Sequence, residues 1–176
     1  MQYLSYTLSH GITYVKTGNV FILAYSDSDW AGCLSTRKSR SGGVILINGS
    51  WIITICKLQS SISLSSCEAE LIALVEVIKE IMWLQNFLDE LNVQYNRPTV
   101  IHVDNKSAIA LAKNPVNHRA SKHIDLRYKF MCRQLDDTRM QLEYIPTGDN
   151  LADLMTKSTS FIVFQKLVGQ LVQEHP

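Results

Sequence analysis

Residues 20–55 decide the fold, and they read VFILAYSDSDWAGCLSTRKSRSGGVILINGSWIITI. The apolar run Val20–Tyr25 predicts a short buried strand, and the acid-containing stretch Ser26–Asp29 follows it directly. The basic, Ser-rich stretch Ser35–Gly43 predicts a loop that leads into the next strand. This part of the chain therefore predicts a strand that delivers carboxylates to one edge of a sheet.

The second half of the same segment predicts a β-hairpin. Val44–Ile47 and Trp51–Ile55 are apolar and strand-sized, and they flank Asn48-Gly49. Asn-Gly is the strongest short-range signal for a two-residue hairpin turn, because both residues tolerate a positive φ. Together with the strand before it, the hairpin predicts three strands in meander order.

Helices and strands alternate further along the chain. Ser65 and Glu68 form a capping-box pattern, and apolar residues then recur every three or four positions as far as about Leu91. The later predicted elements are a strand at Thr99–Val103, a helix at Ser107–Lys113, a helix over about 123–135, a strand at Met140–Ile145, a helix over about 150–157 and a helix at Phe161–Val172. This order predicts an α/β fold, in which a five-stranded mixed sheet is flanked by helices.

Composition excludes several classes of protein. The chain has 176 residues, of which 46% are hydrophobic and 19% charged, so it is neither a disordered tail nor a highly charged solvating chain. Its formal net charge of +1 excludes whole-chain charge as a source of nucleic-acid binding. No apolar run approaches the ~20 residues that span a bilayer, so we expect no membrane partner. The four cysteines are scattered without a C-x-x-C pair, which disfavours a disulfide scaffold or a structural zinc site.

Four carboxylates are candidates for one site. Asp27 (or Asp29) follows the first strand and Asp104 follows the fourth, while Glu70 and Asp153 lie in the first turns of predicted helices. Strand ends that lie side by side form the usual ligand crevice of an α/β sheet. Converging carboxylates repel one another unless cations bind, and Mg²⁺ prefers such oxygen ligands. Acids after strands are also common as turn formers and helix caps, so spacing alone leaves both interpretations open.

Six motifs resemble one known family. They are YSDSDWAG (25–32), RKSRSG (37–42), LSSCEAELIAL (64–74), VDNKSAIALAKNP (103–115), KHIDLRYKF (122–130) and LEYIPTGDNLADLMTK (142–157). In this order they resemble the ribonuclease H domain of the Pol polyprotein of copia-type LTR retrotransposons. The resemblance is dense from about residue 20 to 158.

The resemblance implies a ribonuclease H-like fold and a specific activity. Members of this family hydrolyse the RNA strand of RNA–DNA hybrids by a two-metal-ion mechanism, with two Mg²⁺ ions (or Mn²⁺ as a substitute) held by an Asp-Glu-Asp-Asp set. By motif, that catalytic and metal-binding set falls on Asp27, Glu70, Asp104 and Asp153. In this scheme Asp27 bridges both ions, Asp104 and Glu70 hold the ion on the leaving-group side, and Asp153 helps to hold the ion that activates water.

Neighbouring residues receive other interpretations. We expect Asp29 to lie in a turn or beside the metal ligands without binding metal itself. We expect Glu68 to cap its helix rather than bind metal. Cellular relatives carry a mobile histidine in the loop before the last aspartate. Here that loop, Thr147–Asn150, has no histidine, which argues against histidine-assisted turnover but not against the metal site.

Basic residues near the predicted site are candidates for contact with the phosphates of a hybrid. One cluster is Arg37, Lys38 and Arg40, and a second stretch contains Lys122 and His123, with Arg119 and Arg127 nearby. Phosphate contacts supply most of the affinity of nucleic-acid binding, whereas the alternative is a solvated loop. For Trp30, next to the first acids, a position in the core is favoured over a stacking role.

The resemblance also predicts the organisation and context of the chain. Residues 1–19 correspond to the end of the connection to a reverse transcriptase, 20–158 to the ribonuclease H domain and 159–176 to a C-terminal helical tail. The expected partners are an RNA–DNA hybrid and the reverse transcriptase domain of the same polyprotein. The expected location is intracellular, in cytoplasmic virus-like particles or in the nucleus. The rival hypotheses are a catalytically silent remnant that only binds nucleic acid or a partner, and a DNA-directed nuclease or transposase of the same broad fold.

Overall fold

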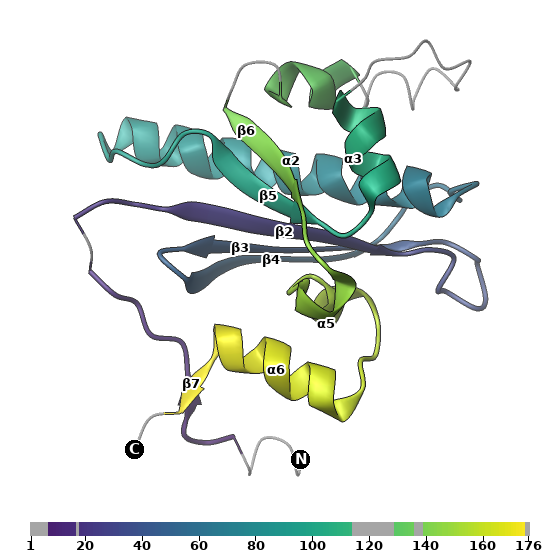
Figure 1. Cartoon of the computed structure of the whole chain (residues 1–176), viewed down its shortest axis with the longest axis horizontal. Coiled ribbons are helices and arrows are strands. Elements are labelled where there is room, and N and C mark those ends of the chain that lie inside the picture. Colours follow the sequence, from purple (N-terminus) through teal and green to yellow (C-terminus); the bar gives the residue numbers. More distant parts are fainter. Residues whose placement is uncertain (1–6, 17, 114–128, 136–138, 175–176) are drawn as a thin grey trace.

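A five-stranded mixed sheet forms the centre of the molecule (Figure 1). The computed structural model describes residues 7–16, 18–113, 129–135 and 139–174. The sheet has the order β4-β3-β2-β5-β6, in which β3 is antiparallel to β2 and β4, while β5 is parallel to β2 and β6. Its strands are β2 (Ile22–Asp29), β3 (Arg40–Ile47), β4 (Ser50–Leu58), β5 (Thr99–Val103) and β6 (Met140–Tyr144). The predicted fold class is confirmed.

The predicted hairpin joins β3 to β4. Asn48 and Gly49 have φ values of 51° and 79°, which is the left-handed pair that a type I′ turn requires. The Asn48 side chain also accepts a hydrogen bond from the backbone N–H of Phe21, with N···O 2.8 Å. The turn is therefore tied to the start of the neighbouring strand.

Several predicted strand boundaries are wrong, and β4, for instance, ends at Leu58 rather than at Ile55. β2 does not stop at Tyr25 but continues to Asp29, and β3 begins at Arg40 rather than at Val44. The residues Arg40–Gly43, predicted as part of a loop, pair with β2, so that Asp27 lies opposite Gly42. Backbone pairing does not require apolar side chains, and the small polar residues of this region are buried beneath helices rather than solvated.

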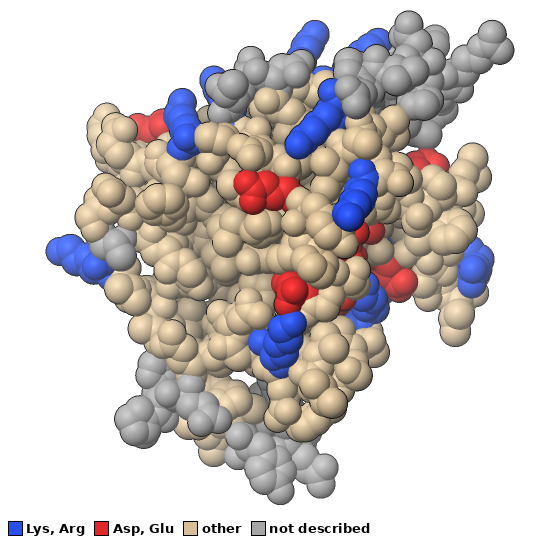
Figure 2. Space-filling view, in the orientation of Figure 1, with Lys and Arg blue, Asp and Glu red and all other residues tan. Residues whose placement is uncertain are grey.

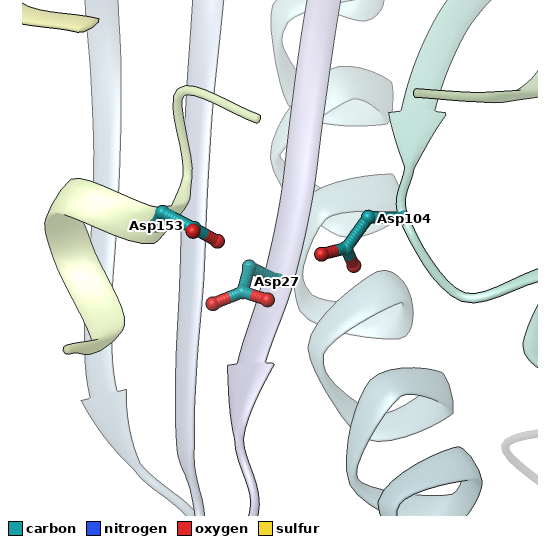
Figure 3. A group of neighbouring side chains, drawn as sticks. All are labelled: Asp27, Asp104 and Asp153. Carbon is teal, nitrogen blue, oxygen red and sulfur yellow. The ribbon is translucent and has the colours of Figure 1, made fainter. Parts of the chain in front are cut away.

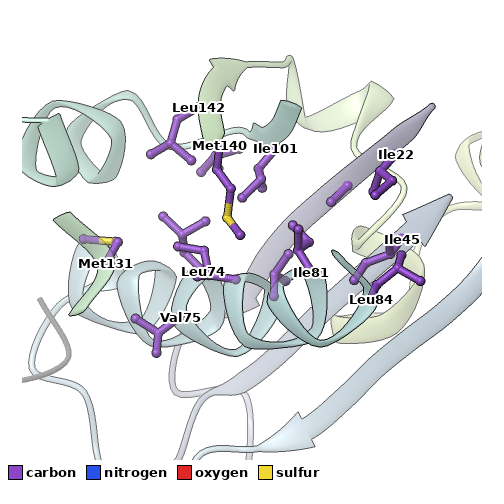
Figure 4. Close-up of a cluster of buried hydrophobic side chains, with 14 of the residues drawn as sticks. Ile22, Ile45, Leu74, Val75, Ile81, Leu84, Ile101, Met131, Met140 and Leu142 are labelled. Carbon is purple, nitrogen blue, oxygen red and sulfur yellow. The ribbon is translucent and has the colours of Figure 1, made fainter. Parts of the chain in front are cut away.

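One face of the sheet is covered by α2 (Ser66–Glu90) and α3 (Lys106–Lys113) (Figure 1). The predicted cap is present, because the Ser65 hydroxyl accepts a hydrogen bond from the Glu68 N–H. The buried face of α2 packs mainly on β3 and on the even-numbered residues of β2, and β5 and β6 add side chains to the same apolar cluster (Figure 4). The largest fully buried side chains of this cluster include Ile22, Ile45, Leu74, Ile78, Ile81 and Ile101. Residues 129–135 are helical, and the rest of the helix predicted over 123–135 lies outside the described residues.

The opposite face is covered by α5 (Asp153–Thr156) and α6 (Phe161–Leu171), after the short 3₁₀ helix η1 (Thr147–Asp149). Leu151, Leu167 and Leu171 pack there against Tyr25, Val44 and Leu46. Among the helices that the structure describes, none has both the length and the apolar character needed to cross a membrane.

The two ends of the described chain meet. β1 (His10–Gly11) pairs antiparallel with β7 (Gln173–Glu174). The N-terminal segment also contacts β4, because the Ser50 hydroxyl donates to the Thr13 carbonyl at 2.6 Å. Residues on both sides of the predicted 20–158 domain therefore pack on each other and on the sheet.

The close approach of α5 to β3 generates a prediction about Gly42. A Cβ atom at this position would lie 2.4 Å from Thr156 Cγ2 and 2.9 Å from the Ala152 carbonyl oxygen. Because Ala152 contributes backbone, α5 must move to admit the methyl group. We expect Gly42→Ala to lower the free energy of unfolding by about 1–3 kcal/mol, measured by urea denaturation. Gly169→Ala, where nothing lies within 4 Å, is the control and should cause no loss; equal stabilities of the two variants would contradict the prediction.

Candidate metal centre

Three aspartates from three different elements converge at one end of the sheet (Figure 3). Asp27 belongs to β2, Asp104 follows β5 and Asp153 begins α5. Each offers a carboxylate oxygen, and these oxygens all lie within 4.8 Å of one another. Asp27 lies between the other two and is 1% exposed, Asp153 is 3% exposed, and Asp104 is half-buried. The parallel pairing of β2 with β5 brings the first two together, because the carboxyl ends of parallel strands meet at the same edge.

A buried asparagine fixes the third aspartate against β2. The Asn150 side chain donates to the Ser26 carbonyl at 3.0 Å and accepts from the Ala152 N–H at 3.1 Å. These bonds join the start of α5 to the strand that carries Asp27. From the end of α5, the Thr156 hydroxyl donates to Asp27 Oδ2, which fixes the orientation of that carboxylate.

Glu70 is the fourth acid at this end of the sheet. It lies in α2 and is 6% exposed, and its Oε2 atom is buried without a hydrogen-bond partner among the described residues. Burial, with the negative charges of Asp27 and Asp104, raises the pKa of Glu70 to about 9. Glu70 is thus electrostatically part of the cluster, although its oxygens lie outside the three-aspartate group. All four acids predicted from the sequence are brought to one place.

The other two acids near the site have local roles. Glu68 Oε2 accepts a hydrogen bond from the Leu64 N–H at 2.8 Å, and its own N–H donates to Ser65. Glu68 therefore caps α2. The Asp29 carboxylate faces the turn after β2, where a Cβ on Gly32 would lie 1.6 Å from Asp29 Oδ2. Asp29 lies outside the three-aspartate group.

Two residues of the site were missed by the sequence reasoning. Thr156 contacts Asp27, and the Lys157 ammonium lies 3.0 Å from Asp153 Oδ1 and 3.7 Å from Asp27 Oδ2. The spacing of four between Asp153 and Lys157 was a usable signal, because such pairs can meet along a helix. The contacts with Asp27 had no local signal, since they join residues far apart in the chain.

The electrostatics of the cluster favour a bound cation. Burial raises the pKa of Asp27, and Thr156 and Lys157 only partly oppose it. Burial and the charge of Asp27 raise the pKa of Asp153 to about 6, again against Lys157. All the donors are carboxylate oxygens, and one oxygen of Glu70 has no hydrogen-bond partner in the part of the chain that the structure describes. Such a donor set fits a hard divalent cation such as Mg²⁺.

The predicted phosphate-binding residues lie in different settings. Arg37 is exposed, has a φ of 54° and sits in a turn closed by its N–H bond to the Cys33 carbonyl at 2.7 Å. Lys38 is half-buried, and Arg40 lies in β3 with its guanidinium near Cys56. Lys122 and His123, like Arg119 and Arg127, lie outside the described residues. In Figure 2, basic side chains border the acidic ones on the face in view.

The core position expected for Trp30 is wrong. Trp30 is 50% exposed, and its indole N–H donates to the Ser63 carbonyl at 3.1 Å. It follows the end of β2, where the chain turns away from the sheet, so an apolar ring there has no core to enter. The hydrogen bond instead ties this turn to the segment before α2.

Comparison with known proteins gives matches in sequence and in fold, although no family model matches the chain. The chain is 37% identical over 166 residues to the Retrovirus-related Pol polyprotein from transposon RE2 of Arabidopsis thaliana, covering 94% of this chain and 11% of the polyprotein. It is 39% identical over 148 residues to the corresponding polyprotein from transposon TNT 1-94 of Nicotiana tabacum, covering 82% of this chain and 11% of that protein. The chain thus spans about a tenth of the length of these relatives.

The fold matches that of solved ribonucleases H. LC11-RNase H1, isolated from compost, superposes with a TM-score of 0.58 at 14% identity, over 77% of this chain and 92% of that one. Another structure of the same protein holds an RNA/DNA hybrid. The chain therefore has the ribonuclease H fold and belongs with the Pol polyproteins of copia-type retrotransposons.

Proposed function

We propose that the chain is a Mg²⁺-dependent ribonuclease H, which hydrolyses the RNA strand of RNA–DNA hybrids during retrotransposon reverse transcription. The observation that carries the proposal is the convergence of Asp27, Asp104 and Asp153, with Glu70 beside them, at one end of a ribonuclease H-fold sheet. Support for the substrate comes from a structural relative that binds an RNA/DNA hybrid and from the Pol polyprotein relatives.

The proposed mechanism assigns a task to each acid. Asp27, with a carboxylate neighbour on either side, would be shared between two ions. Asp104 and Glu70 would complete the leaving-group side, and Asp153 the side of the attacking water. Bound ions lower the pKa of the water nucleophile and stabilise the leaving 3′-oxygen. Mn²⁺, which also accepts carboxylate ligands, would substitute for Mg²⁺.

Residues around the acids would keep this arrangement ready. The hydrogen bond from the Thr156 hydroxyl would fix the orientation of the Asp27 carboxylate, and the bond from Asn150 to Ser26 would fix the position of α5 on the sheet. Burial of Asp27 and Asp153 limits competition from water for their oxygens. Recognition of the hybrid would depend on its shape and its 2′-hydroxyl groups rather than on base sequence.

The proposal extends to the context of the chain. We infer that it works as one domain of a polyprotein, with residues 20–158 as the ribonuclease H domain and the reverse transcriptase domain as its partner. The shared span with the Pol polyproteins supports this context. The corresponding location is intracellular, in cytoplasmic particles or the nucleus.

Loss of one aspartate tests the proposed activity. Asp104→Asn should reduce Mg²⁺-dependent cleavage of a labelled RNA strand annealed to DNA by about a hundredfold or more, because it removes a charge that stabilises the reacting state. Asp89→Asn is the matched control, since Asp89 is an exposed acid near the C-terminal end of α2 that pairs with Arg97, and it should cleave like the unaltered chain. Near-normal cleavage by Asp104→Asn would refute the assignment.

Two further cleavage assays distinguish the proposed ribonuclease H from a DNA-directed nuclease and from a catalytically silent remnant. Cleavage of duplex DNA in place of the hybrid would favour a DNA-directed nuclease. Absence of cleavage by the folded chain, even with the reverse transcriptase domain added in trans, would favour the silent remnant.

Charge removal at Glu70 tests the repulsion within the site without measuring activity. The pKa of Glu70 rises from an ordinary value of 4.5 to about 9 on folding, so folding takes up a proton and stability in EDTA falls as pH rises through this window. Glu70→Gln should flatten that fall and raise the Tm at pH 8, by roughly 2–4 °C for each kcal/mol that burying and protonating this acid costs the fold.

The control for this experiment lies on the same helix. Glu76 forms ion pairs with Lys57 and Lys79, which help to lower its pKa. Glu76→Gln should therefore leave the Tm unchanged or slightly lower. If both variants had the same Tm, or if Glu70→Gln were the less stable, the proposed cost of burying Glu70 would be refuted.

Salt dependence tests the basic turn. Arg37→Ala with Lys38→Ala should weaken binding of a hybrid and reduce the slope of log K against log salt by about 1–2, because each phosphate contact releases a counterion. Binding is measured in the Asp104→Asn background to prevent cleavage. Lys79→Ala, on the outer face of α2, is the control; an unchanged slope in the double variant would make the turn a solvated surface.

A further inference from the structure

One cation lies directly against the acid cluster. The Lys157 ammonium is 3.0 Å from Asp153 Oδ1 and 3.7 Å from Asp27 Oδ2. The side chains of the two aspartates are 4% and 2% exposed, whereas that of Lys157 is 35% exposed. A partly exposed lysine side chain thus places its ammonium against two buried carboxylates.

Lys157 lies next to Asp153 because the short helix α5 connects the two residues. Lys157 is the C-cap residue of α5, and its backbone N–H donates to the Asp153 carbonyl at 3.2 Å. Both the backbone and the side chain of Lys157 therefore contact Asp153. The backbone is fixed by this bond, while the four-carbon side chain has rotatable bonds that can carry the ammonium away into solvent.

The Lys157 ammonium partly offsets the free-energy cost of burying Asp27 and Asp153 next to each other. Two buried carboxylates close to each other repel, and each loses hydration. Burial alone lowers the pKa of Lys157, but Asp27 and Asp153 outweigh this effect and keep the pKa above its ordinary value. Lys157 is therefore charged at neutral pH and supplies one positive charge to the pair.

The same oxygens are the ones that a divalent cation would use. Asp27 and Asp153 are two members of the three-aspartate group, and Lys157 contacts one oxygen of each. An ammonium and a divalent ion on shared oxygens repel each other at close range. The ammonium and the divalent ion therefore compete for these carboxylates, and each weakens the binding of the other.

We propose that Lys157 is a displaceable counter-ion, whose ammonium neutralises the Asp27–Asp153 pair in the metal-free protein and moves to solvent when a divalent cation takes those oxygens. This inference rests on the proposed metal site and adds a residue that sets its affinity. Lys157 preserves the fold when metal is scarce and, in doing so, weakens metal binding. A lysine that served only to tether α5 would have the opposite effect on affinity, because its loss would disorder a ligand.

Calorimetric titration of the whole chain with Mg²⁺ alone tests the proposal. Lys157→Met keeps most of the length of the side chain and removes its charge, so we expect a lower Tm in EDTA and Mg²⁺ binding tighter by about fivefold or more. Lys157→Arg retains the charge and should bind Mg²⁺ like the unaltered chain. Lys79→Met is the matched control, because the Lys79 ammonium pairs with Glu76 on α2 at 3.0 Å, and it should leave the Mg²⁺ affinity unchanged.

The outcomes distinguish this proposal from the proposed function. If the unaltered chain binds Mg²⁺ and Lys157→Met binds it equally or more weakly, the counter-ion role is overturned and the metal site stands. If the unaltered chain binds no Mg²⁺, the metal site fails and the counter-ion role fails with it.

A measurement on the unaltered chain remains decisive if Lys157→Met does not fold. In protein with ¹³C-labelled lysine, the Cε signal of Lys157 is assigned by its loss in Lys157→Arg. On addition of Mg²⁺ we expect this signal to move toward those of solvent-exposed lysines such as Lys113. A signal that stays unchanged while Mg²⁺ binds would overturn the proposal.

Discussion

The structure holds four acidic side chains at one end of a sheet, where burial and the charges of their neighbours oppose their ionisation. Asp27 and Asp153 are almost fully buried, and Glu70 has a buried oxygen with no described hydrogen-bond partner. Packing elsewhere must supply the free energy that keeps them there. It does so from both sides, because one apolar cluster joins α2 to the sheet and a second joins α6 and the segment before α5 to the opposite face.

Strand β2 connects these two layers at the site. Its alternation directs Tyr25 and Asp27 toward α5, and Ser26 and Ser28 toward α2, from which Glu70 extends. Only small residues fit between the acids and the helices, as the contacts around Gly42 show. The end of β2 therefore consists of small polar residues although β2 is a central strand, because the site needs polar side chains and leaves little space for large ones.

This requirement explains where sequence reasoning succeeded and where it failed. The Ser65 cap, the strand Thr99–Val103 and the Asn48-Gly49 turn depend on local signals, and the structure has them as predicted. The ends of β2 and β3 were predicted wrongly, because a small polar sequence in a strand has the composition of a loop. The four acids were located by motif, whereas the contact between Thr156 and Asp27 arises only when α5 packs on the sheet.

The segment before Asp153 differs in kind from a mobile loop. Thr147–Asp149 forms η1, and the Lys166 ammonium from α6 contacts both the Gly148 carbonyl, at 3.1 Å, and the Asp149 carboxylate. Helix α6 thus fixes the approach to the acid cluster, and β7, which follows it, pairs with β1. The residues after position 158 are consequently part of the structure that positions Asp153. Because this approach is held by contacts with α6 and carries no histidine, the proposed movement of charge at the site falls to the side chain of Lys157.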